Sequence, residues 1–253
     1  MSARQDSFTL GAYAPVFTSD DSRPLTIAHG LEHALPGLYL GWTMTQAEGL
    51  ILLPQRDEWI KQQKMADRGL PFLCNDDENH VVTLTGWEIP AGQCPGNHSQ
   101  LKVSVSLPPD PAVITAGRNI LVEVAESAGA LWGHLTPDSV MLDIADQTGP
   151  KMHGPEKPPR GLPALQFPEE ITAPEIPQYL GWVNYWSAAA ARALGFPDPA
   201  RDAELLSRSR RTATGGWVVQ LTRAPLDLDN PAHLDTLKRT YERFPEIGGR
   251  AAP

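Results

Sequence analysis

Two histidines and a glutamate near the amino terminus have the spacing of a zinc hydrolase motif. His29, Glu32 and His33 follow the order H-x-x-E-H, in which two imidazoles ligate zinc and the carboxylate acts as general base. Glu123 or Glu126 would have to supply a third ligand. The predicted helix is short, and its periodicity places the three motif residues opposite its apolar side chains. The pattern therefore favours a solvated helix face, and a zinc-dependent hydrolase with Glu32 as catalytic residue is the alternative.

An acidic turn separates two predicted strands. Asp76, Asp77 and Glu78 lack the alternating carboxylates and central glycine of a calcium loop, so no metal is expected there. A solvated turn is the simplest interpretation. The same carboxylates could instead contact a basic surface on another protein.

Other catalytic signatures are missing from the sequence. No G-x-S-x-G motif and no phosphate-binding glycine loop occurs. Cys74 and Cys94 are not part of a CxxC pair, which excludes a zinc ribbon and predicts buried, reduced thiols. The seven tryptophans lie mostly in apolar strand contexts, which favours core packing over a platform for bases or sugars. We therefore expect no cofactor.

The charge and hydropathy of the chain indicate which kinds of partner it can bind. The formal net charge of -9 and the pI near 5.2 argue against direct binding to nucleic acid, whose phosphates are normally held by basic domains. The amino terminus lacks the pattern of a secretory signal, and no apolar run approaches the roughly 20 residues that span a bilayer. A cytoplasmic protein is expected.

Periodicity predicts alternating helices and strands around these motifs. Strands are expected at 8–17, 38–45, 49–53, 80–88, 100–107 and 217–222. Helices are expected at 24–35, 55–68, 110–128, 187–194 and 199–211, and from Asn230 onward. The helix at 199–211 would be capped by Asp198 and would end in an arginine run.

These elements predict an α+β fold with a mixed or antiparallel sheet and helices packed on one face. The repeated Tyr-Leu-Gly-Trp at 39–42 and 179–182 suggests two similarly built halves, 1–149 and 178–253, within one compact unit. Between them, residues 150–177 are too rich in proline for regular structure. Because this segment also carries Leu162, Leu165, Phe167 and Ile171, we expect an ordered arm packed on the body.

The carboxy-terminal third resembles a known family. The blocks 179–186 (YLGWVNYW), 215–221 (GGWVVQL) and 230–234 (NPAHL) are similar to uncharacterised bacterial proteins related to the immunity protein 52 family. This resemblance implies an α+β protein that neutralises a cognate bacterial toxin, often a nuclease-type domain, by binding it. It transfers no catalytic residue.

An acidic inhibitor could be steered onto the basic cleft in which a nuclease holds phosphate. On this hypothesis the candidate toxin-binding residues are Asp76, Asp77, Glu78, Glu169 and Glu170. A scaffold protein without catalysis or a toxin partner is a further alternative.

Overall fold

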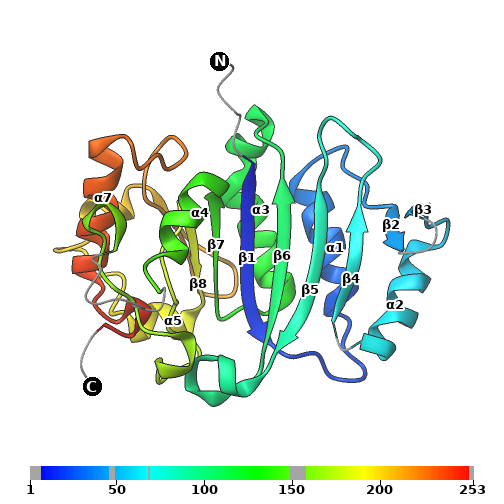
Figure 1. Ribbon diagram of the computed structural model, residues 1–253, viewed down its shortest axis with the longest axis horizontal. Coiled ribbons are helices and arrows are strands. Elements are labelled where there is room, and N and C mark those ends of the chain that lie inside the picture. The colour runs from blue at the N-terminus through cyan, green and yellow to red at the C-terminus, as the bar shows by residue number, and fades with distance from the viewer. Residues whose placement is uncertain (1–6, 46–48, 68, 149–157, 251–253) are drawn as a thin grey trace.

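The computed structural model describes residues 7–45, 49–67, 69–148 and 158–250 (Figure 1). Within these residues one sheet of ten strands has the order β3-β2-β4-β5-β6-β1-β7-β8-β10-β9, and each neighbouring pair is antiparallel. The strands are β1 Phe8–Pro15, β2 Trp42–Thr45, β3 Gly49–Leu52, β4 Leu70–Cys74, β5 Thr83–Ile89, β6 Gln100–Leu107, β7 Trp132–Pro137, β8 Val183–Trp186, β9 Ser209–Arg211 and β10 Trp217–Gln220. The α+β class with an antiparallel sheet is confirmed.

In the part of the chain that the structure describes, seven α-helices accompany the sheet. They are α1 Arg23–Ala34, α2 Arg56–Asp67, α3 Pro111–Ala128, α4 Asp138–Ala145, α5 Ala188–Ala193, α6 Ala203–Leu206 and α7 Pro231–Arg243. In Figure 1, α1 and α3 lie behind the sheet, whereas no helix lies in front of β1, β6 and β5. We call the face toward the viewer the near face and the face against α3 the far face.

The longest helix forms where the sequence supplies both caps and a regular apolar stripe. The Asp110 side chain accepts from the Ala112 N–H, and Gly129 ends α3 in the left-handed conformation at φ 63°. Buried residues such as Ile120 and Leu121 point at the far face of the sheet. Because α3 packs against β1, β7 and β8, it holds the centre of the sheet in place.

The proline-rich arm is ordered where the structure describes it. Leu162, Leu165 and Ile171 are buried, whereas Phe167 is 40% exposed. The Leu165 N–H donates to the Gln147 carbonyl, which fastens the arm beside α4. Residues 150–157 of the predicted arm lie outside the described residues.

The prediction of one helix at 199–211 is wrong. Only Ala203–Leu206 is helical, and the following Ser209–Arg211 forms the edge strand β9 on β10. Pairing with β10 therefore overrides the helical propensity of the segment. Asp202, in place of Asp198, directly precedes the helix, and it is buried against Arg243 at 2.6 Å.

Candidate interaction surface

The near face of three adjacent strands is open and polar. Side chains opposite each other in register lie on the same face of a sheet. Register therefore aligns Thr83 with Ser106 and Thr9, Thr85 with Ser104 and Gly11, and Trp87 with Lys102 and Tyr13. We define the open face as the exposed or half-buried members of these rows, namely Thr9, Thr83, Thr85, Trp87, Lys102, Ser104 and Ser106.

Strict alternation in the sequence produces this surface. In β6 the intervening Leu101, Val103, Val105 and Leu107 are all buried on the far face. An antiparallel sheet can keep one face on the core and the other in water, as these strands do. The open face is thus a regular, hydroxyl-rich surface, and α1 and α3 lie behind the sheet (Figure 1).

Trp87 is the one large apolar side chain among the residues that define the open face. Its side chain is 45% exposed, and the Lys102 Nζ lies 5.3 Å from the Trp87 ring centroid and 5.7 Å from the Tyr13 ring centroid. The cation between two aromatic rings restrains the indole. The expectation that tryptophans serve the core is wrong for Trp87, whose place in the Thr83-Thr85-Trp87 alternation indicated a solvent-facing position.

An apolar hairpin continues the open face toward one edge of the sheet. Trp42 pairs with Leu52 and Met44 pairs with Leu50 across β2 and β3. Met44 is 61% exposed, Leu50 45% and Leu52 50%. Trp42 also pairs with the buried Cys74, which pairs with Thr83, so the register places this side of the hairpin on the same side of the sheet as the open face. We call Trp42, Met44, Leu50 and Leu52 the apolar hairpin.

The same near face is closed on the other side of β1. There the Tyr13 hydroxyl lies 3.0 Å from the Tyr179 hydroxyl, which lies 2.9 Å from His134 Nε2. The other imidazole nitrogen of His134 is 3.2 Å from the Thr136 hydroxyl. Burial, with a smaller contribution from the charge of Lys102, lowers the pKa of His134 from 6.5 to about 3. The neutral imidazole therefore ties the start of the 179–186 block to the sheet.

The predicted acidic contacts do not form one site. Asp76 and Glu78 are exposed, whereas the Asp77 carboxylate accepts from the Asn79 and His80 backbone N–H groups, which lower its pKa. This turn precedes β5, and the pair at 169–170 lies at the opposite end of that strand, where the Gly96 N–H donates to the Ile171 carbonyl. At about 3.4 Å per residue, the seven-residue β5 separates the two groups by roughly 24 Å.

The second acidic group is itself divided. The Glu170 carboxylate accepts from the Phe167 backbone N–H at 3.0 Å and so caps a short 3-10 turn. Glu169 is exposed. Of the predicted toxin-binding carboxylates, Asp77 and Glu170 therefore have structural hydrogen bonds, and Asp76, Glu78 and Glu169 project toward solvent.

The H-x-x-E-H residues point to separate partners. His29 Nε2 lies 3.2 Å from Asp57, and His33 Nδ1 lies 3.7 Å from Glu123. Glu32 turns away from solvent, in contrast to the expectation, because its carboxylate accepts from the Leu40 N–H and from the buried Arg56 guanidinium.

The remaining candidate ligands are also accounted for. Glu126 accepts from the Thr214 hydroxyl at 2.6 Å. Cys74 and Cys94 are buried, unpaired thiols, as expected, and burial raises the pKa of each. Among the residues that the structure describes, no three His, Cys, Asp or Glu side chains are grouped to hold a metal ion.

The family of the chain follows from its sequence profile. The profile of the family described as Domain of unknown function (DUF5953) matches residues 19–252. The chain belongs to this family. No curated protein is significantly similar to this DUF5953 chain. The resemblance to immunity protein 52 stays a prediction.

A solved structure shares the fold of this DUF5953 protein. The Pseudomonas aeruginosa T6SS protein PA0821 has a TM-score of 0.56 and 13% sequence identity, over 96% of this chain and 74% of that one. At that identity the likeness concerns the fold. No helix among the described parts of the DUF5953 chain has the length and hydropathy of a membrane span.

Proposed function

We propose that this protein neutralises a protein toxin, of the nuclease class, by binding it non-catalytically through the open face and the apolar hairpin. One observation carries the proposal: the register places the exposed apolar side chains of the hairpin on the same side of the sheet as the open face. Contiguous exposed apolar surface on a folded domain is typical of protein-binding sites.

The composition of this surface suits a protein partner. Trp87 is a large aromatic side chain with a restrained orientation, the kind that dominates the binding energy of interfaces. The surrounding threonine and serine hydroxyls can form hydrogen bonds without the desolvation cost of buried charge. The surface thus combines one anchor, an apolar edge and a polar surround, as interfaces do.

Charge supports a basic partner. The net charge of -9 attracts a protein whose substrate cleft is positive, and it accelerates encounter at low ionic strength. Asp76 and Glu78, exposed in the turn between β4 and β5, are placed to meet lysine and arginine residues at the rim. The fold similarity to a T6SS protein supports a role beside secreted toxins, with neutralisation in the cytoplasm of the producing cell.

Co-expression with a toxin encoded by a neighbouring gene tests the proposal. We expect growth to be rescued by the wild-type protein and by Leu142→Asp, a control that places the same charge on α4 at a 72% exposed position. Leu50→Asp and Trp87→Ala should lose rescue and weaken binding at least tenfold by calorimetry. Their melting temperatures should match the wild type.

Two outcomes would defeat the proposal. The first is a wild-type protein that neither binds nor protects against the neighbouring toxin. The second is stoichiometric zinc that disappears in His33→Ala, which would restore the hydrolase alternative. Binding that survives both Leu50→Asp and Trp87→Ala would show that the toxin contacts another surface, and it would defeat the proposed binding mode alone.

A further inference from the structure

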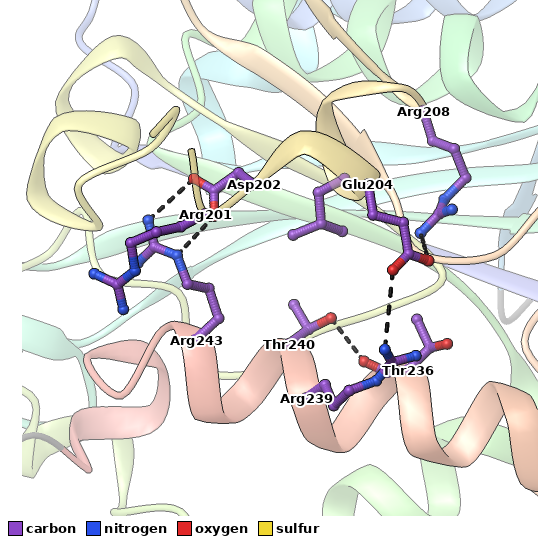
Figure 2. Close-up of a pocket in the computed structure, with 9 residues that line it drawn as sticks. Arg201, Asp202, Glu204, Arg208, Thr236, Arg239, Thr240 and Arg243 are labelled. Carbon is purple, nitrogen blue, oxygen red and sulfur yellow. Dashed lines mark hydrogen bonds and ion pairs between the residues drawn. The ribbon is translucent and has the colours of Figure 1, made fainter. Parts of the chain in front are cut away.

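Arginines line two neighbouring pockets near α6, and the first is neutralised internally. Figure 2 shows Asp202 paired with Arg243, at 2.6 Å, and Glu204 between Arg208, at 3.1 Å, and Arg239, at 3.9 Å. Arg201 also lines this pocket. The carboxylates of Asp202 and Glu204 therefore occupy the acceptor positions that an anion would need.

In the second pocket, Arg208 is the only arginine with such an ion pair among the described residues. This pocket lies on the far face between α3 and the end of β10, with a volume of about 360 Å³, at the lower end of the roughly 300–1,000 Å³ of small-molecule sites. Its lining consists of Ile114, Thr115, Arg118, Trp182, Ser207, Arg208, Gln220 and Arg223. Three of these side chains are cationic, and none is a carboxylate.

Two of the three guanidinium groups lack acceptors. Arg208 is fixed by its Nε hydrogen bond to the Gln220 carbonyl and by its ion pair with Glu204. In the described parts of the chain, no hydrogen bond or ion pair involves the guanidinium of Arg118 or of Arg223. Both residues are exposed, so these two groups present donors to solvent beside the oriented Arg208.

The neutral side chains of the lining use their donors within the protein. The Thr115 hydroxyl donates to the Pro111 carbonyl, and the Ser207 hydroxyl donates to the Glu204 carbonyl. The Gln220 amide donates to the carbonyls of Thr222 and Arg223. The pocket is thus rich in charged donors and holds no charged acceptor, although the chain as a whole is acidic.

We propose that this pocket binds a small oxyanion of the phosphate type, held by Arg118, Arg208 and Arg223. The planar guanidinium matches the oxygen spacing of phosphate and can form two parallel hydrogen bonds with it. A phosphate would accept from Arg118 and Arg223 while Arg208 keeps its tie to Glu204. This site is on the face opposite the open face, so ligand and protein partner can bind together.

Calorimetry with inorganic phosphate, at ionic strength held constant with chloride, tests the site on the purified protein alone. We expect binding to the wild type and at least tenfold weaker binding for Arg118→Gln and Arg223→Gln. Arg201→Gln is the matched control, because it removes one exposed arginine from the neutralised pocket and should change affinity less than twofold.

Further arms distinguish the source of the phosphate. Tighter binding of adenosine monophosphate than of inorganic phosphate would indicate a phosphate monoester as ligand, whereas equal affinity would indicate the free ion. No measurable phosphate binding by the wild type overturns the proposal, as does equal weakening in Arg201→Gln. Because no toxin is present, such a failure leaves the proposed neutralisation untouched.

Discussion

One half of the near face of the sheet is open, and the other half is covered. On β5, β6 and β1 the near face carries hydroxyls and an exposed indole. On β7, β8 and β10, Trp132, Trp186 and Trp217 lie opposite one another in register. Trp132 and Trp186 are buried, and Trp186 packs edge-on against Phe196 at 5.1 Å and Phe244 at 5.1 Å. Residues after the arm and the end of α7 provide this cover.

The difference shows that aromatic content alone does not define the core of this protein. Trp87 and Trp132 belong to the same row of the sheet, with Lys102 and Tyr13 between them. Their roles differ because a later segment of the chain covers one of them. The boundary falls at Tyr13, which is stacked on Trp132 with ring centroids 3.9 Å apart.

Removing one tryptophan from each side should give the largest contrast. We expect Trp186→Ala to lower the free energy of unfolding by about 3–5 kcal/mol, because it deletes a fully buried ring. Trp87→Ala, the matched exposed change, should cost no more than about 1 kcal/mol, mostly through the lost contact with Lys102. Urea denaturation measures both. Comparable losses would mean that the open face is covered in solution.

The covered side should also respond to acid. The folded pKa of His134 is about 3, below its ordinary 6.5, so the unfolded state binds the proton first as pH falls. Stability from this group is complete above pH 6.5 and is lost toward pH 3. Between pH 6.5 and pH 5 the expected loss is about 1.5 kcal/mol.

His134→Gln should flatten this dependence, whatever its effect on absolute stability. His33→Gln is the control, because the side chain of His33 is 80% exposed and should leave the slope unchanged. Urea titrations at pH 6.5, 5.8 and 5 measure the slope. An unaltered slope in His134→Gln would show that His134 is solvated.

The smallest effect is expected at the boundary between the two sides. Lys102→Met removes the cation between the Trp87 and Tyr13 rings and should cost about 0.5–1 kcal/mol. High salt should reduce the difference from the wild type. Ser104→Ala, on the same strand and face, should be within about 0.5 kcal/mol of the wild type. A larger loss in Ser104→Ala than in Lys102→Met would contradict the aromatic restraint.

Local signals in the sequence predicted the elements whose patterns are regular. The strand at 100–107 was predicted with the observed bounds because its alternation is complete, and α3 because Asp110 and Pro111 start it. Asn230 caps α7 as expected, and Ser187, the first residue of the helix expected at 187–194, caps α5. Where side-chain periodicity and capping residues agree, the sequence predicts the helix or strand correctly.

The strand Trp132–Pro137 was not predicted, because all six of its residues are buried and no alternation marks it. The role of His134, which lies in this strand, was therefore missed as well. Its imidazole occupies the space beside Gly11 on the neighbouring strand β1, where a Cβ would come within 2.5 Å of the His134 Nε2. The pairing of Gly11 with His134 depends on register between distant segments. Local patterns do not contain that information.

The surface sites escaped prediction for the same reason. The pocket of Arg118, Arg208 and Arg223 gathers a helix, a turn and a loop that are far apart in sequence. The acidic residues were predicted from their local concentration, and in the structure the carboxylates of two of them accept hydrogen bonds from backbone N–H groups. Carboxylates that are close in sequence therefore did not form the single site that was predicted. The arginines of the pocket are far apart in sequence and come together only in the folded chain.

The two outer strands of the sheet are unequal toward a neighbouring molecule. β9 carries Arg210 and Arg211, whose like charges would repel an identical strand laid beside it. β3, at the opposite rim, has no charged residue and exposes Leu50 and Leu52. Pairing with a strand of another molecule, in concentrated solution or in a complex, is therefore favoured at the outer edge of β3 and not at that of β9.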